Sequence, residues 1–78
     1  MNRLPVISAK DFYKLLLAYG CEPLSSNGSH FKVRYPGSGR VAPVPVHGNR
    51  DIKREFMKDI LWELGIDVSE FLEFMQNN

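Results

Sequence analysis

The segment HFKVRY, residues 30–35, carries the clearest alternation of apolar and polar side chains in the sequence. Phe31, Val33 and Tyr35 share one parity, and a histidine and two cationic side chains share the other. Successive side chains of a β-strand point to opposite faces of a sheet, so this pattern predicts a half-buried strand. We expect its apolar side chains to pack under helices and its polar side chains to stand on an open face.

Turn signals on both sides of this segment predict two more strands. A Ser-Asn-Gly turn at residues 26–28 separates it from a short strand predicted at residues 21–25. A Pro-Gly-Ser-Gly turn leads to a third strand, RVAPVPV, residues 40–46. Pro43 and Pro45 share a parity, so their missing N–H groups leave one side of that strand unable to pair. The pattern therefore predicts a three-stranded antiparallel sheet with residues 40–46 at its edge.

Apolar residues at helical spacing predict one helix before the sheet and two helices after it. The first helix is expected to begin at a Ser8 cap and to end at Gly20. The second is expected to begin near residues 50–51 and to end at Gly65, and a short last helix follows an Asp67 cap. The predicted order is α-β-β-β-α-α, which is an α+β fold with helices covering one face of the sheet.

The second predicted helix is expected to bury one apolar stripe. Its cap is predicted to be Asn49 or Asp51. The stripe is predicted to contain Ile52, Phe56, Ile60 and Leu64, joined by Met57 and Leu61. Trp62 lies about opposite this stripe, so it is expected to be either exposed or covered by the last helix.

The length of 78 residues and the hydrophobic content of 44% predict one domain, residues 1–78, with a modest core. No stretch approaches the roughly 20 apolar residues of a membrane span, and residues 1–10 lack the apolar region of a secretory signal. The single cysteine, Cys21, cannot form an internal disulfide and is expected to act as a small buried hydrophobe. These features predict a cytoplasmic protein that does not bind a membrane.

The charged side chains are unevenly distributed, although the net charge is only +1. Residues 1–54 hold nine of the ten lysines and arginines but only three of the nine acidic residues. This asymmetry predicts one basic face that binds a polyanion and an acidic end that faces elsewhere. Ordinary solvated surface charges would also explain it.

The polar face of the 30–35 strand places a histidine beside two cations. His30, Lys32 and Arg34 are neighbours on that face, and the parity of the third strand places His47 on it as well. Cleavage of RNA through its 2′-hydroxyl needs a base, cations that hold the phosphate, and an acid for the leaving oxygen. An imidazole suits either proton-transfer role near neutral pH. Neither a zinc-ligand spacing nor a carboxylate cluster accompanies these residues, so the sequence predicts no metal and no cofactor.

Each of these side chains also has an ordinary structural explanation. A single histidine on a short strand is commonly a surface or capping residue. Lys32 and Arg34 are side chains that any exposed strand face carries. His47 can also bond a backbone group at the point where the sheet turns into the following helix.

A basic cluster near the start of the second predicted helix indicates phosphate binding. Arg50, Lys53 and Arg54 are expected in its first turn, where the helix dipole disfavours each exposed cation by about 0.3–1 kcal/mol. A helix N-terminus that is flanked by cations is a binding site for phosphate groups. We therefore expect these three side chains to contact an RNA backbone, unless screening makes the unfavourable term trivial.

Three segments of the chain, in this order and at these separations, resemble the HicA family of toxins. They are GSHFKVRY at residues 28–35, VPVHGN at residues 44–49 and IKREFMKDILWELGI at residues 52–66. The resemblance runs from about Ile7 to Leu72. It implies a double-stranded-RNA-binding-like α-β-β-β-α fold, here with an extra short C-terminal helix. Many relatives carry a second histidine where this chain has Phe31, which belongs to the core face by parity.

The resemblance also implies a function. The family acts as mRNA interferases that are neutralised by a HicB antitoxin, and its catalytic histidine corresponds to His30. We therefore expect a toxin-type endoribonuclease that cleaves mRNA without metal, is monomeric when free and forms a hetero-oligomer with a HicB-like antitoxin. The expected RNA-binding residues are Gly28, Ser29, Lys32, Arg34, His47, Arg50, Lys53 and Arg54. A non-catalytic RNA-binding module with the same fold is the alternative, and a pure protein-interaction domain fits the basic face less well.

Overall fold

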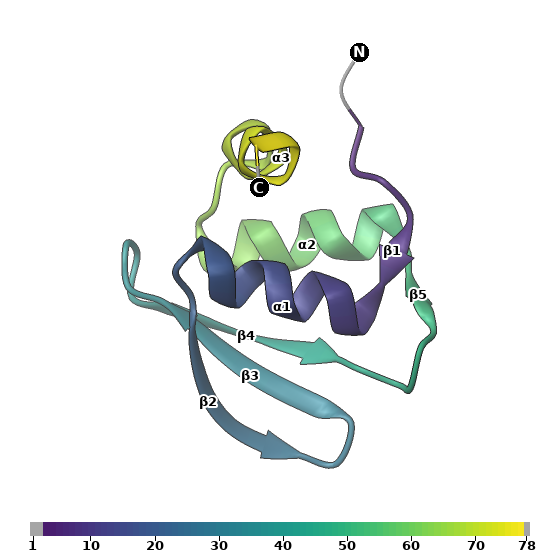
Figure 1. Cartoon of the computed structure of the whole chain (residues 1–78). Coiled ribbons are helices and arrows are strands. Elements are labelled where there is room, and N and C mark those ends of the chain that lie inside the picture. Colours follow the sequence, from purple (N-terminus) through teal and green to yellow (C-terminus); the bar gives the residue numbers. More distant parts are fainter. Residues whose placement is uncertain (1–2, 78) are drawn as a thin grey trace.

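The structure is a computed structural model that describes residues 3–77. Within that range, three helices and two small antiparallel sheets form an α+β fold (Figure 1). The elements in chain order are β1 (Ile7–Ser8), α1 (Ala9–Tyr19), β2 (Glu22–Asn27), β3 (His30–Tyr35), β4 (Arg40–Pro45), β5 (Asp51–Ile52), α2 (Arg54–Leu64) and α3 (Val68–Asn77). The predicted order α-β-β-β-α-α is confirmed, and the short β1–β5 pair is an addition to it.

The three longer strands form the predicted antiparallel sheet in the order β2-β3-β4, with β4 at an edge. The prediction of a turn at residues 26–28 was wrong, because Ser26 and Asn27 still pair with β3. The chain reverses one residue later, where Gly28 has a φ of 63°. Glycine tolerates this left-handed conformation without steric cost, so the strand can continue through Asn27 and the chain can turn at Gly28.

The predicted helix caps of α1 and α3 are present. The Ser8 side chain accepts a hydrogen bond of 3.0 Å from the backbone N–H of Asp11, at the start of α1. The carboxylate of Asp67 accepts one of 3.1 Å from the backbone N–H of Glu70, at the start of α3. Each bond satisfies one of the backbone donors that a helix N-terminus otherwise leaves without a partner.

The second helix begins later than the sequence predicts. Asp51 and Ile52 pair with Ser8 and Ile7 as strands β5 and β1, and the backbone N–H of Ala9 donates to the carbonyl of Arg50. The predicted cap at Asn49 or Asp51 was therefore wrong, since this part of the chain forms the strand pair. Lys53 is the N-cap of α2, and its side chain makes no capping hydrogen bond.

The later start of α2 accompanies a different buried stripe. Met57, Ile60, Leu61 and Leu64 are buried at helical spacing, whereas Phe56 is 43% exposed. The prediction that Phe56 belongs to the core stripe was wrong. Its position is offset by about 100° from that of Met57 on the helix, which turns it away from the core. Trp62 is 77% exposed, which confirms the first of its two predicted environments.

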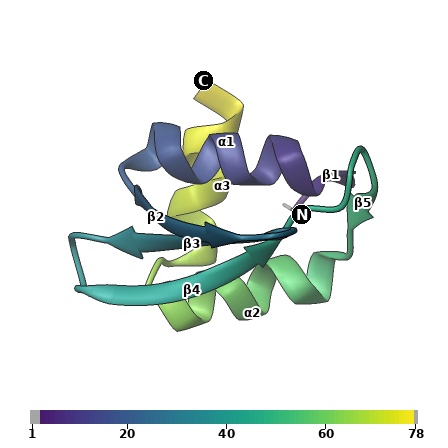
Figure 2. The same ribbon diagram turned by 90° about the horizontal axis from the view of Figure 1, so that it is seen from below.

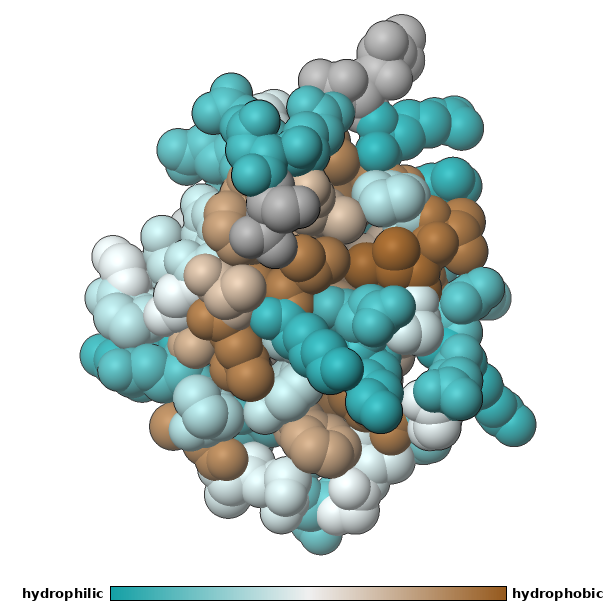
Figure 3. Space-filling view, viewed as in Figure 1, coloured by the Kyte–Doolittle hydropathy of each residue, from teal (hydrophilic) through white to brown (hydrophobic). Residues whose placement is uncertain are grey.

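The helices form two layers on one side of the three-stranded sheet. α1 and α2 lie side by side over the sheet, and α3 crosses them on the side away from it (Figure 1). Phe12, Val33 and Phe71 are fully buried and join these layers in one core. Some apolar surface remains visible between α3, α1 and β1 (Figure 3). The other face of the sheet carries no helix from residues 3–77, and Figure 2 shows the molecule from that side.

Cys21 lies directly after α1 and is 5% exposed, as predicted for a small buried hydrophobe. Burial raises the pKa of its thiol to about 11, from an ordinary value of 9.0. The native state therefore keeps the proton more tightly than the unfolded chain does. The stabilisation that this difference provides is complete below pH 9 and is lost as pH rises towards 11.

We expect the free energy of unfolding of the wild-type protein to fall between pH 9 and pH 11 by on the order of 2 kcal/mol more than that of Cys21→Ala. Urea unfolding at a series of pH values measures this difference. Tyr19, whose pKa burial also raises, is present in both proteins, so the difference between them reports the thiol. Parallel pH profiles for the two proteins would contradict the expectation.

Candidate nucleic-acid interface

His30 stands at the start of β3 on the open face of the sheet. Its side chain is exposed, whereas Val33 of the opposite parity is fully buried, which confirms the predicted alternation. His30 lines a hollow of about 290 Å³ together with Ser25, Asn27 and Lys32. An imidazole and an ammonium group therefore border the same hollow on the open face.

His47 lies beside His30, although it comes after the end of β4. The pairing of His30 with Pro45 brings the end of β4 next to the start of β3. The backbone N–H of Val46 donates to the carbonyl of Ser29 at 2.6 Å, which holds the connection in place. The centroids of the two imidazole rings are 6.3 Å apart, with an angle of 82° between the ring planes. The structure thus brings together the two histidines that the sequence placed on one face.

A larger hollow of about 790 Å³ opens next to this histidine pair. It is lined by four of the predicted RNA-binding residues, Gly28, Ser29, His47 and Arg50. Lys10 of α1 lines it too, although Lys10 is not among the residues predicted from the sequence to bind RNA. From the helical spacing of the sequence, Lys10 can be predicted to face solvent, but not to lie near the histidines. The β1–β5 pairing, which holds the start of α1 beside Arg50, is what brings Lys10 to the hollow.

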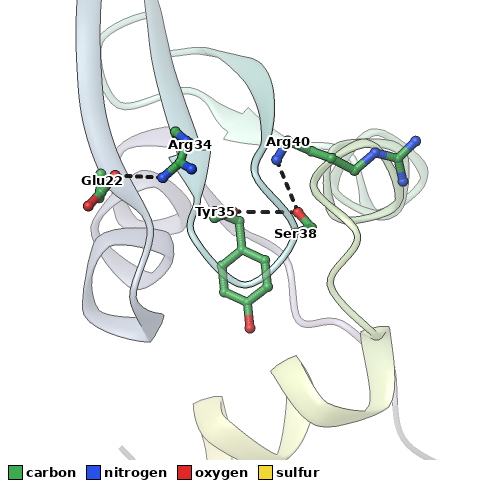
Figure 4. A network of polar contacts seen from close by, with 5 residues as sticks. All are labelled: Glu22, Arg34, Tyr35, Ser38 and Arg40. Atoms are coloured by element: carbon green, nitrogen blue, oxygen red, sulfur yellow. Dashed lines mark hydrogen bonds and ion pairs between the residues drawn. The ribbon is translucent and has the colours of Figure 1, made fainter.

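Arg34 is less available for RNA than predicted. Its guanidinium forms an ion pair of 3.1 Å with Glu22 of the neighbouring strand β2 (Figure 4). The two side chains are 41% and 57% exposed, and an ion pair in this setting stabilises a protein by about 0–1 kcal/mol. A phosphate can therefore compete for Arg34 at a small cost. Within residues 3–77, Lys32 has no such carboxylate partner.

The predicted basic cluster of α2 is divided by the structure. Arg50 precedes β5 and Lys53 is the N-cap, so the prediction that both lie in the first helical turn was wrong. Arg54 is in that turn, but it is half-buried and its guanidinium donates a hydrogen bond to the carbonyl of Leu4. Arg50 and Lys53 line a hollow of about 260 Å³ together with His47. Arg54 lines neither this hollow nor the other two hollows that the histidines line.

A family model described as the HicA toxin of bacterial toxin-antitoxin matches residues 9–66 of the chain. The chain belongs to the HicA toxin family. Comparison with curated proteins gave no significant match, and comparison with solved structures gave none either. The resemblance seen in the sequence is thereby confirmed, and membership in the HicA family implies that the protein works in a partnership with an antitoxin.

The matched part of this HicA toxin contains the histidine pair and its surrounding cations, and it ends before α3. Phe31 follows His30 and packs edge-to-face on Tyr13 of α1, with ring centroids 5.1 Å apart. It lies on the helix-covered face, as its parity predicts. Phe31 therefore packs against α1.

Neither a metal site nor a membrane-spanning helix is found within residues 3–77. Among residues 3–77, no three histidine, cysteine, aspartate or glutamate side chains gather closely enough to hold a metal ion. None of the helices in the same range is both long and apolar enough to cross a membrane.

Proposed function

We propose that this HicA toxin is an endoribonuclease that cleaves mRNA through His30 and requires no metal. The observation that carries the proposal is the pair of exposed imidazoles, His30 and His47, whose ring centroids are 6.3 Å apart at the edge of a basic surface. At this spacing both imidazoles lie close enough together to act on the oxygens of one phosphate group. Family membership supports the toxin role of this site.

The two imidazoles can supply both proton transfers of the reaction. A neutral imidazole removes the proton of the ribose 2′-hydroxyl, whose oxygen then attacks the adjacent phosphorus. A protonated imidazole donates its proton to the 5′-oxygen as the phosphorus–oxygen bond breaks. The products are a 2′,3′-cyclic phosphate and a 5′-hydroxyl end. His30 takes one of these roles in the proposal, and His47 takes the other.

The cations around the pair stabilise the phosphate charge. Lys32 shares a hollow with His30, and Lys10 and Arg50 share one with His47. Each is exposed and able to approach the RNA backbone. We propose that Lys32 acts at the scissile phosphate and that Lys10 and Arg50 hold phosphates beside it.

The remaining predicted contacts play smaller parts in the proposal. Gly28 and Ser29 line the larger hollow, and Lys53 extends the basic surface into the adjoining hollow that His47 and Arg50 also line. Arg34 joins the site when it exchanges Glu22 for a phosphate. Arg54 acts through the fold rather than through RNA, because its guanidinium already binds the N-terminal segment.

A HicB-like antitoxin neutralises the toxin in this proposal. The free toxin is monomeric, and the complex with the antitoxin is hetero-oligomeric. The support is membership of a toxin–antitoxin family together with the basic site, which an acidic partner surface can cover.

The proposal is tested by incubating the purified protein with a structured mRNA in EDTA and analysing the ends of the fragments. We expect cleavage that is unaffected by the chelator and fragments with cyclic phosphate and 5′-hydroxyl ends. Fragments with 3′-hydroxyl ends, or activity that the chelator abolishes, would overturn the mechanism. RNA that is bound but never cut would instead favour a non-catalytic RNA-binding module.

A further inference from the structure

Phe56 is an exposed aromatic side chain at the start of α2, and neither the core nor the proposed reaction uses it. Phe56 is 43% exposed, and its neighbour Met57 fills the core position of this turn. Among residues 3–77, no other aromatic ring pairs with it. The exposed part of Phe56 leaves apolar aromatic surface open to water, where a ligand can cover it.

Phe56 borders the histidine site. It lines the hollow of about 260 Å³ that His47, Arg50 and Lys53 also line. His47 and Arg50 border the larger hollow as well, and the centroid of the His47 ring is 6.3 Å from that of the His30 ring. The surface is therefore continuous from His30, across His47, to Phe56.

The charges around Phe56 favour a nucleic acid over a basic or neutral peptide as the molecule that binds there. Arg50 and Lys53 are exposed cations in its hollow, and Asp51 is the one acidic residue among the residues that line it. The other strongly exposed aromatic residue of the helix, Trp62, lines a hollow in which two cations, Arg40 and Lys58, are balanced by two acidic residues, Asp59 and Asp67, whereas the cations around Phe56 outnumber the acidic residue there. An aromatic face between cations is the arrangement with which proteins stack a base and hold its flanking phosphates.

We propose that Phe56 stacks an unpaired base of the substrate, which makes single-stranded RNA the preferred substrate of this site. The inference rests on the proposed function, because the base on Phe56 belongs to a nucleotide that flanks the phosphate between His30 and His47. A duplex keeps the faces of its bases stacked on one another, so it offers no free face to Phe56. Single-stranded segments, such as loops, expose theirs.

The test measures binding separately from cleavage. In a His30→Ala background, fluorescence anisotropy gives the dissociation constants of a labelled single-stranded oligonucleotide and of a duplex with the same sequence. We expect the added change Phe56→Ala to weaken single-strand binding at least about fivefold and to leave duplex binding almost unchanged. Phe56→Trp is expected to retain single-strand binding, because it keeps a stacking surface.

Trp62→Ala is the matched control, since it removes a more exposed aromatic side chain from the same helix. We expect it to leave both dissociation constants unchanged. Single-strand binding that Phe56→Ala leaves unchanged, or a loss that is equally large with Phe56→Trp, would overturn the inference. Failure of the proposed function would be seen in a different measurement. The wild-type protein would then not cleave RNA, whether or not Phe56→Ala weakens single-strand binding.

Discussion

Replacement of His30 by alanine is expected to lower the rate of RNA cleavage by about 10²- to 10⁴-fold, the usual contribution of a positioned acid or base. The side chain is exposed on the open face of β3, and the core on the other face holds the strand in place. Loss of the imidazole is therefore expected to remove the proton transfer without opening a cavity in the core. Single-turnover cleavage of a defined RNA in EDTA measures the effect, and circular dichroism checks the fold.

His30→Gln is the sharper variant, because it keeps a polar side chain of similar length but cannot exchange a proton near neutral pH. We expect it to be as inactive as the alanine variant. His47→Ala serves as the partner variant, and we expect the double variant to be little worse than either single variant, because the two groups act in one reaction. Full activity of His30→Gln would show that His30 does not transfer a proton.

The second large effect concerns α3, which lies beyond the residues that match the family model. Replacement of Phe71 by alanine is expected to lower the free energy of unfolding by about 3–5 kcal/mol. The Phe71 ring is fully buried and lies 5.8 Å from Phe12, 5.3 Å from Tyr19 and 6.2 Å from Phe74, measured between ring centroids. A domain of this size has a total stability of about 5–15 kcal/mol, so this loss would remove much of it.

Urea unfolding followed by circular dichroism measures the loss. Phe74→Ala is the matched control on the same helix, because its ring also contacts Tyr19 and Phe71 but is only partly buried. We expect it to cost clearly less than Phe71→Ala. A change below about 1 kcal/mol for Phe71→Ala would show that α3 does not contribute to the core in solution.

Local patterns in the sequence determined most of the fold. The alternation in residues 30–35 decided which face His30 occupies, because the two-residue period of a strand is a local property. Ser8 and Asp67 marked two helix starts, since a cap bonds a backbone group only three residues away. The two prolines of β4 placed it at the edge, because they remove hydrogen-bond donors wherever the strand lies.

Other features depend on pairings between segments that are distant in the sequence, and local patterns do not predict them. The β1–β5 pair delayed the start of α2 and brought Lys10 to the site. The contact between β2 and β3 joined Arg34 to Glu22.

The histidine site combines both kinds of information. Strand parity placed His30 and His47 on one face, but their separation of 6.3 Å depends on the register between β3 and β4. Register is a property of two strands together, and no periodicity within either strand contains it. The exposure of Phe56 likewise follows from how α2 packs on the core. The sequence by itself therefore determined which residues are candidates for the chemistry, and only the tertiary structure decided which of them meet.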